Sequence, residues 1–183
     1  MKTEIAFDIG LQDYSVHQLL LEDIVAIQVL CEKCLDFMLL VDGRPAEPKG
    51  VEEDFLSVPP GKSFDDKFVF GIMNQQNEMV GLLDTLRCYP DEKTWWIGLL
   101  LFIPETRSQG IGKKVLHGFV EYVRLSGAQA IMLGVVEENT LAYKFWERMG
   151  FEFVRKTEPR RFGNKTQTVS IMRQSISDGN CPH

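Results

Sequence analysis

The sequence has few of the residues that build metal sites or covalent catalytic sites. Its 183 residues include only three histidines, His17, His117 and His183, and these do not recur at the spacing of metal ligands. A Gly-x-Ser-x-Gly nucleophile motif is also absent. The sequence therefore predicts that no metal is bound and that no serine-hydrolase mechanism operates.

Cysteine is also scarce, with four residues at uneven spacing: Cys31, Cys34, Cys88 and Cys181. These are too few for a disulfide framework. Cys31 and Cys34 have the spacing of a redox or zinc pair, but there is no second Cys-x-x-Cys. Both thiols fall on one side of a predicted helix, which favours buried packing over chemistry.

Long apolar runs are missing too. No run reaches the roughly 18 residues that a membrane span requires. The first residues, Met-Lys-Thr-Glu-Ile, lead into acids rather than into the apolar core of a signal peptide. We therefore expect no membrane partner and, by default, a cytoplasmic location. With 44% hydrophobic and 25% charged residues, 183 residues suit one globular domain with a sizeable core.

The most informative feature present is a glycine-bearing turn, residues 104–116, which follows the apolar run 95–103. A turn that opens a helix offers backbone N–H groups, and the helix dipole adds partial positive charge there. Gly110 and Gly112 allow close approach of a ligand. Full positive charges come from Arg107, Lys113 and Lys114. The pattern predicts an anion site that suits a pyrophosphate.

Two common phosphate-binding loops do not fit this turn. A dinucleotide-binding turn needs a third glycine where Val115 stands. A P-loop needs glycine at the position of Arg107 and Ser or Thr at the position of Lys114. The remaining pattern is Arg-x-x-Gly-x-Gly.

This pattern resembles the acyl-CoA signature of the GNAT superfamily of N-acetyltransferases. A second stretch, residues 138–151, is similar to the same family's downstream segment, Asn-x-x-Ala-x-x-aromatic-Tyr-Glu-x-x-Gly-Phe. The two motifs occur in the family's order with a helix and a strand between them. The resemblance implies an acyltransferase that uses acetyl-CoA.

Hydrophobic periodicity predicts the elements around the two motifs. Helical spacing indicates a helix from Glu22 to near Asp42-Gly43, a short helix at 51–57, and further helices at 111–126 and 139–149. Short apolar or alternating runs predict strands at 16–20, 67–73, 79–87, 94–103, 130–136, 151–157 and 165–173.

This order, β-α-α-β-β-β-α-β-α-β-β, predicts an α+β fold with a mixed, mostly antiparallel twisted sheet flanked by helices. It is also the GNAT order. We expect a lead-in segment at 1–15, one acetyltransferase domain at 16–174 and a disordered tail at 175–183.

The resemblance implies which residues bind the acyl donor. The strand before the turn would pair its backbone with pantetheine at Leu101, Phe102 and Ile103, and one of these N–H groups would stabilise the carbonyl oxygen. The turn would hold the pyrophosphate through Arg107, Ser108, Gln109, Gly110, Ile111, Gly112 and Lys113. Asn139, Ala142 and Phe145 would complete the site, with Asn139 serving equally well as a helix N-cap.

The catalytic residues depart from the family pattern. The tyrosine that commonly protonates the departing thiolate aligns with Trp146, which cannot supply a proton. Tyr143, one turn earlier, is the candidate general acid, with surface packing as its alternative. A carboxylate base would fall near Trp96, where no acid stands between residues 94 and 103. Trp96 and the acids at the end of the next strand, Glu137 and Glu138, are the candidate substrate-side residues. A water chain, or a substrate that is already partly neutral, would serve as well as a base.

Charge is uneven along the chain. Residues 1–93 carry 18 acids and 8 bases, a net charge of −10, and residues 94–183 carry 8 acids and 12 bases, a net charge of +4. A basic half suits a polyphosphate, and an acidic half attracts a cation, unless both are ordinary solvated surface. The overall acidity argues against nucleic acid as a partner.

The resemblance implies direct transfer of an acetyl group from acetyl-CoA to a primary amine of a small molecule or peptide, within a ternary complex, and the charge pattern favours a cationic amine. The alternative is a CoA-binding sensor or interaction module without catalysis. The sequence leaves the oligomeric state open, with a homodimer among the allowed states.

Overall fold

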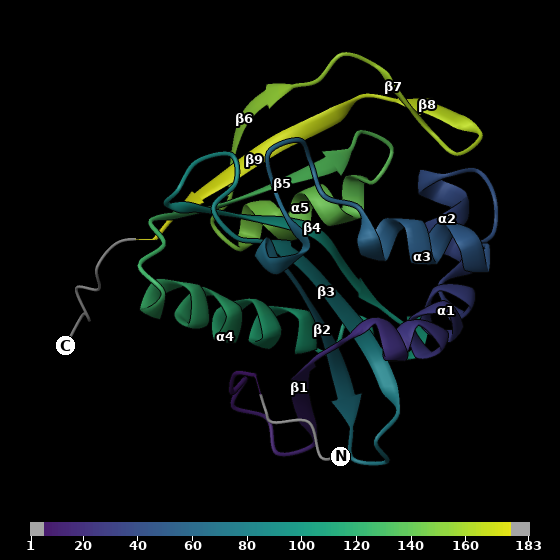
Figure 1. Cartoon of the computed structure of the whole chain (residues 1–183), viewed down its shortest axis with the longest axis vertical. Helices are drawn as coiled ribbons and strands as arrows, with labels where there is room; N and C mark the ends of the chain where they lie inside the picture. Colours follow the sequence, from purple (N-terminus) through teal and green to yellow (C-terminus); the bar gives the residue numbers. More distant parts are fainter. Residues whose placement is uncertain (1–5, 177–183) are drawn as a thin grey trace.

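The computed structural model describes residues 6–176, which form a seven-stranded sheet covered by helices and a separate small hairpin (Figure 1). The strands are β1 (Tyr14–Gln18), β2 (Lys67–Asn74), β3 (Met79–Leu86), β4 (Thr94–Phe102), β5 (Ala130–Val136), β6 (Glu152–Lys156), β7 (Arg160–Phe162), β8 (Lys165–Gln167) and β9 (Val169–Ser175). The α-helices are α1 (Ile24–Lys33), α2 (Leu35–Val41), α3 (Pro48–Leu56), α4 (Ile111–Leu125) and α5 (Thr140–Arg148).

The sheet has the order β1-β2-β3-β4-β5-β9-β6. Only the β4–β5 pair is parallel, because the α4 crossover joins them, and every other pair is antiparallel. The mixed, mostly antiparallel sheet that we predicted is confirmed. The C-terminal part differs in detail, because β9 lies between β5 and β6, and β7 and β8 form their own hairpin.

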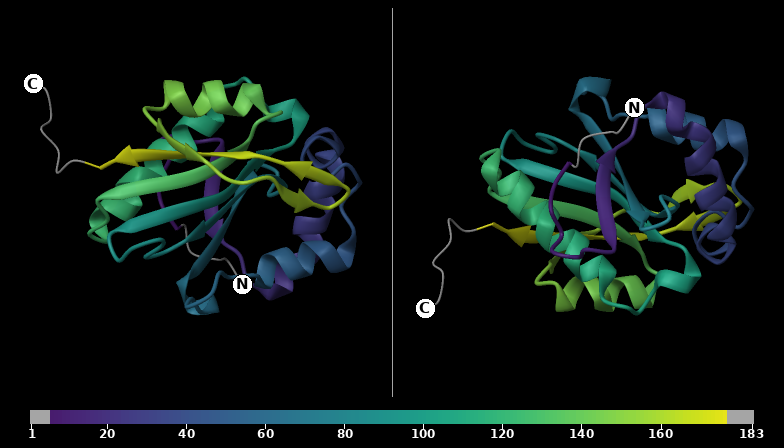
Figure 2. Two further views of the ribbon diagram at one scale, coloured as in Figure 1. Left: turned by 90° about the horizontal axis from the view of Figure 1, so that it is seen from above. Right: turned by 90° about the horizontal axis from the view of Figure 1, so that it is seen from below.

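Helices pack on both faces of the sheet, as the views of Figure 2 show. Helices α4 and α5 cover the first face, which we call the α4 face. There Phe119 is fully buried and meets Trp95 edge to face, at 5.8 Å between ring centroids. Helices α1, α2 and α3 cover the opposite face, which we call the α3 face.

The helix predicted from Glu22 to near Asp42-Gly43 is broken at Cys34. Cys34 has φ −99° and ψ 37°, which lie outside the helical range, and α2 starts at the next residue. Its fully buried thiol donates to Phe102 O at 3.4 Å. The tertiary contact therefore sets the break, which no helix-stop residue announces in the sequence. Burial raises the pKa of the neighbouring Cys31 thiol to about 12, consistent with packing rather than chemistry.

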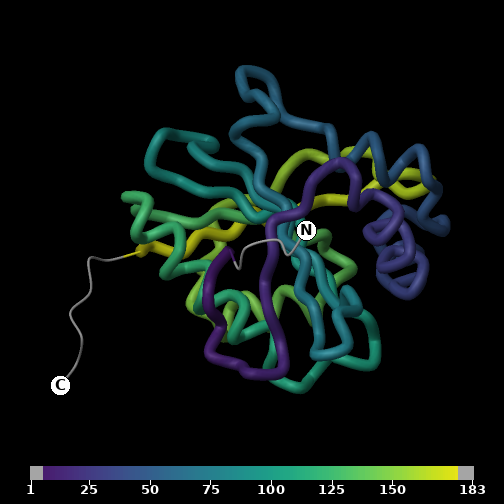
Figure 3. The backbone as a smooth tube through the Cα atoms, turned by 60° about the horizontal axis from the view of Figure 1, so that its bottom comes forward, coloured from purple at the N-terminus to yellow at the C-terminus, as the bar shows by residue number. Residues whose placement is uncertain are grey.

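The predicted lead-in segment contributes to the core. Residues 6–13 contain no helix or strand, yet Phe7 and Ile9 are buried, and Phe7 meets Phe70 edge to face. Figure 3 shows these residues, in purple, making a U-shaped turn before β1. They lie so close to α4 that a Cβ added at Gly118 would stand 2.5 Å from Asp8 O.

The C-terminal residues differ from the predicted tail at 175–183. Strand β9 reaches Ser175, and Ile176 N donates to Gln129 O, so the predicted tail begins inside the fold. Residues 177–183, with Cys181 and His183, lie outside the described residues. Among residues 6–176, no helix combines the length and the apolar character that a membrane crossing requires.

Candidate active site

Strands β4 and β5 separate in the middle of the sheet. They pair only from Thr94 with Ala130 to Ile97 with Leu133, although β4 continues to Phe102. Beyond this point β5 stays paired with β9, and β4 stays paired with β3. The half of β4 from Gly98 onward therefore has one edge without a strand partner among the described residues.

The backbone groups that point into the gap follow from the alternating direction of hydrogen bonds along β4. Ile103 N donates to Val80 O of β3, at 3.0 Å. Because hydrogen-bonding direction alternates along a strand, Leu101 also faces β3, whereas Leu100 and Phe102 face the gap. Of the three residues predicted to pair with pantetheine, Phe102 directs its backbone there. Its carbonyl already accepts from Arg107 Nε at 2.8 Å, which leaves its N–H group for a ligand.

The glycine turn lies at the end of this half-strand and opens α4. Ser108 and Gly110 have φ of 61° and 80°, the left-handed region that favours glycine, and Gly110 is the N-cap residue. The first helical bond of α4 joins Lys114 N to Gly110 O. Within residues 6–176, the N–H groups of residues 108–113 have no recorded acceptor outside the helix. This is the geometry of an anion site at a helix N-terminus.

Arg107 is engaged elsewhere. Its guanidinium forms a two-bond ion pair with Asp36 of α2, with 3.0 Å between Nη2 and Oδ1. Hydrogen bonding to this guanidinium holds the pKa of the Asp36 carboxyl below its usual value. The charge that we expected to meet a phosphate is therefore directed toward α2.

The second motif packs beside the turn. Asn139 Oδ1 accepts from Ala142 N at 3.1 Å, so the predicted N-cap role of Asn139 is confirmed. A Cβ added at Gly112 would lie 3.5 Å from the Phe102 ring and 3.7 Å from the Phe145 ring. The two motifs thus meet at the N-terminus of α4.

Two aromatic residues of α5 differ in their surroundings. Trp146, in the place of the customary tyrosine, is buried and contacts Phe145 and Phe151 edge to face. Tyr143 is half-buried, and its hydroxyl has no recorded hydrogen bond to any residue in the described part of the chain. The Tyr143 hydroxyl is therefore available for a ligand, whereas Trp146 serves packing.

The predicted substrate-side acids, Glu137 and Glu138, follow the end of β5. Glu137 forms an ion pair with Lys156, and Glu138 forms one with Lys165 at 2.5 Å. Both carboxylates are thus neutralised by lysines from the C-terminal strands. Trp96 is half-buried on the α3 face, where it packs with Val169 and Ile171 and meets Tyr89 edge to face.

A carboxyl group that we did not predict lies where the gap begins. The β3–β4 register shifts between Asp84 and Thr85, so that Gly98 is left without a partner in a bulge. A Cβ added at Gly98 would lie 3.6 Å from Cγ of Asp84. The only sequence signal was a single acid within the mostly apolar run 79–86.

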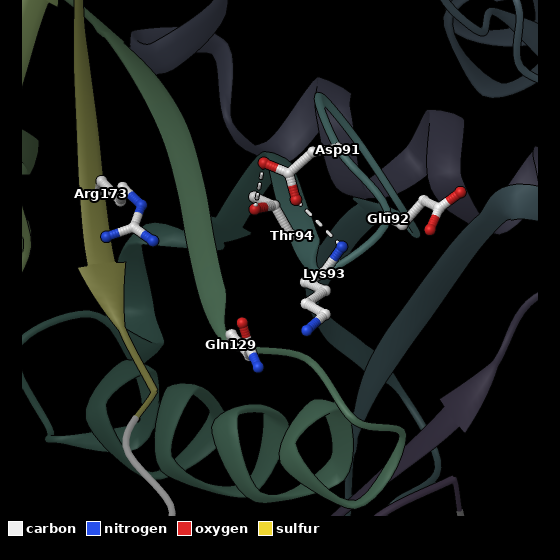
Figure 4. A pocket seen from close by; sticks show the side chains of 6 residues that line it. All are labelled: Asp91, Glu92, Lys93, Thr94, Gln129 and Arg173. Carbon is white, nitrogen blue, oxygen red and sulfur yellow. Dashed lines mark hydrogen bonds between the residues drawn. The ribbon is translucent and has the colours of Figure 1, made fainter.

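A different, polar depression lies at the paired end of β4 and β5 (Figure 4). It has a volume of about 420 Å³ and is lined by Asp91, Glu92, Lys93, Thr94, Gln129 and Arg173. Asp91 already accepts from Lys93 N and from the Thr94 hydroxyl, both at 3.0 Å. Its carboxylate therefore stabilises the turn before β4, away from the gap.

Comparison with known proteins agrees with this geometry. Residues 34–151 match the model of the acetyltransferase (GNAT) family. The N-alpha-acetyltransferase 30 of Schizosaccharomyces pombe is 31% identical over 122 residues, which are 63% of this chain and 75% of that protein.

Solved structures show the same fold. An acetyltransferase from Thermus thermophilus has a TM-score of 0.75 at 20% identity, covering 90% of this chain and 97% of that one. The spermidine N-acetyltransferase of Vibrio cholerae, in complex with CoA and spermine, has a TM-score of 0.71 at 18% identity, covering 91% and 97%.

Proposed function

Because this chain belongs to the GNAT family of acetyltransferases, which use acetyl-CoA, we propose that it acetylates the α-amino group of a polypeptide by direct transfer. The observation that carries the proposal is the unpaired half of β4, which ends at the free N–H groups of the glycine turn. A thioester bound along this edge is open to an amine from the α3 face. The S. pombe relative, named an N-alpha-acetyltransferase, supports a peptide acceptor.

The donor site follows from the backbone. The N–H groups of residues 108–113 would hold the pyrophosphate, with Lys113 adding charge and with Asn139, Ala142 and Phe145 forming the adjacent wall. Pantetheine would run back along β4 toward Gly98, because that is the edge without a strand partner. Phe102 N–H would bind its amide, and Leu100 N–H, nearer Gly98, would face the thioester carbonyl.

The chemistry then needs few groups. Leu100 N–H would stabilise the negative charge that develops on the carbonyl oxygen as the amine attacks. The C–N bond forms, the C–S bond breaks, and the thiolate takes a proton. Tyr143 is the group that we assign to this protonation, since its hydroxyl has no recorded partner in the described part of the chain.

An α-amino group suits this site better than an alkylamine for an energetic reason. The pKa of an α-amino group is about 7.7–8.0, whereas that of a lysine-like amine is about 10.4. At neutral pH, roughly a tenth or more of α-amino groups are uncharged and ready to attack, compared with fewer than about one in a thousand alkylamines. The acidic residues near α3 favour a second candidate, a polyamine, by attracting its positive charge.

Thiol release from acetyl-CoA tests the acceptor class. Three acceptors are compared: a lysine-free peptide with a free N-terminus, the same peptide with its N-terminus blocked and one lysine added, and spermidine. We expect the free N-terminus to give the highest kcat/KM, with mass spectrometry locating the acetyl group on the α-nitrogen. A higher value for spermidine would favour the polyamine, and no release with any amine would restore the non-catalytic CoA-binding alternative.

A further inference from the structure

Asp84 lies next to Gly98, the residue at which the unpaired half of β4 begins. It lies on the α3 face of β3, opposite Leu99 of β4 and beside the bulge at Gly98, one residue past the last β4–β5 pair. A Cβ added at Gly98 would lie 3.8 Å from Asp84 Oδ1. Since Gly98 has no side chain, no β4 side chain at this position covers the carboxyl group.

The two oxygens of Asp84 have different surroundings. Oδ2 lies 3.1 Å from Lys67 Nζ, whose side chain is only 6% exposed. Oδ1 has no recorded hydrogen-bond partner within residues 6–176, and the side chain as a whole is 24% exposed. One oxygen is thus anchored, and the other is open to solvent or to a substrate.

The anchor is itself rigid. Lys67 Nζ also donates to the carbonyl oxygens of Asp54, at 2.7 Å, and Ser57, at 3.0 Å, at the C-terminal end of α3. The lysine therefore joins the sheet to α3 and holds Asp84 in one orientation. This differs from Glu137 and Glu138, which are more exposed and are paired with lysines outside the gap.

We propose that Asp84 is the general base of the transfer, and that it accepts the proton of the attacking amine directly or through one water molecule. The assignment rests on the proposed function. The amine nitrogen loses its proton to Asp84 Oδ1 and forms the C–N bond. The C–S bond then breaks, and the thiolate leaves as the thiol after protonation by Tyr143.

The electrostatic environment suits this role. Burial raises the pKa of Asp84 to about 6; Lys67 opposes this rise, and Asp54 adds to it. Asp54 of α3 in turn interacts with Lys67 of β2, with Glu53 of α3, and with Asp42 and Arg44 of the segment between α2 and α3. A base is most effective with a pKa near the working pH. The equilibrium constant for proton transfer to Asp84 is then unfavourable by only ~100-fold for an α-ammonium group. For an alkylammonium group it is unfavourable by more than ~10⁴-fold.

The test compares pH profiles of kcat/KM for wild type, Asp84→Asn and Asp84→Glu, using the free-N-terminus peptide. Below pH about 6 the kcat/KM of the wild type should fall by an additional tenfold per pH unit, because protonated Asp84 cannot accept a proton. This fall adds to the one caused by protonation of the amine itself. Asp84→Asn should lose this additional slope and about 10²- to 10⁴-fold in kcat, with unchanged affinity for acetyl-CoA. Asp84→Glu should retain the slope.

Lys67→Met provides a second measurement. Removing the cation should raise the pKa of Asp84 further, so the additional slope should begin at a higher pH. An Asp84→Asn enzyme with kcat within threefold of wild type and with the same profile would overturn the assignment while leaving the acetyltransferase intact. A wild-type enzyme that acetylates no amine would overturn the proposed function and the role of Asp84 together.

Discussion

Arg107 donates through both terminal nitrogens to the carboxylate of Asp36, joining the first residue of the Arg-x-x-Gly-x-Gly pattern to helix α2. Its Nε also donates to Phe102 O, the last carbonyl of β4. One guanidinium therefore fixes the end of the strand, the start of the turn and the position of α2. We infer that the arginine of this motif shapes the anion site rather than contacting the anion.

This relationship predicts a measurable coupling between the two side chains. In urea unfolding, the cycle of Arg107→Ala, Asp36→Ala and the double variant should give a coupling of about 0.5–1 kcal/mol, because both groups are partly exposed. The folded-state pKa of Asp36 is depressed, so the coupling should be fully present above its unfolded value near 4 and should be lost as the pH falls further.

The same variants separate a structural arginine from a ligand contact. If Arg107 acts through Asp36, Arg107→Ala and Asp36→Ala should weaken acetyl-CoA binding to a similar extent, as measured by calorimetry. A loss of more than tenfold with Arg107→Ala alone would instead place the guanidinium on the pyrophosphate.

The anion site is tested at Gly110, where an added Cβ meets open space. At Gly112 an added side chain would first contact the rings of Phe102 and Phe145. A loss of affinity there could come from disturbed packing as well as from lost phosphate binding. Asp and Asn both tolerate the left-handed conformation of Gly110 and have similar size. Gly110→Asp should therefore bind acetyl-CoA at least about tenfold more weakly than Gly110→Asn, through charge repulsion alone. Equal affinities in the two folded variants would show that no phosphate binds here.

Tyr143→Phe tests the general acid. Because general acid catalysis contributes ~10²- to 10⁴-fold, kcat should fall on that scale with little change in affinity for acetyl-CoA. Tyr143→Trp serves as a control that keeps an aromatic ring without a phenol. A fall in kcat of less than about threefold with Tyr143→Phe would leave Tyr143 with a packing role only.

Salt dependence tests the acidic character of the α3 face. Burial raises the pKa values of Asp42 and Asp54 as well as that of Asp84, so these carboxyl groups share a region of low solvation. For a cationic peptide N-terminus, kcat/KM should rise with pH across the neutral range and fall as salt screens the attraction. A peptide of the same length with acidic residues near its N-terminus is the control and should show the opposite salt dependence.

Local patterns in the sequence were enough to predict the mixed sheet, the glycine turn and the order of the elements from β2 to α5. Periodicity identified α4 and the strands 67–73, 79–87 and 94–103 within a few residues, because each depends on neighbours in the chain. The N-cap role of Asn139 was equally local. The break at Cys34 was not, because its cause is a hydrogen bond to Phe102, 68 residues away.

The tertiary structure alone decided which partners the charged side chains around the gap have. Arg107 carries the charge that a phosphate site needs, yet α2 places Asp36 within its reach. Glu137 and Glu138 follow the expected strand, but the returning C-terminal chain supplies their lysine partners. Asp84 lies beside the start of the unpaired half of β4, where one unpaired residue, Gly98, shifts the β3–β4 register. A sequence determines local dihedral preferences and apolar periods, whereas the partners of a charged side chain depend on strand pairing between distant segments.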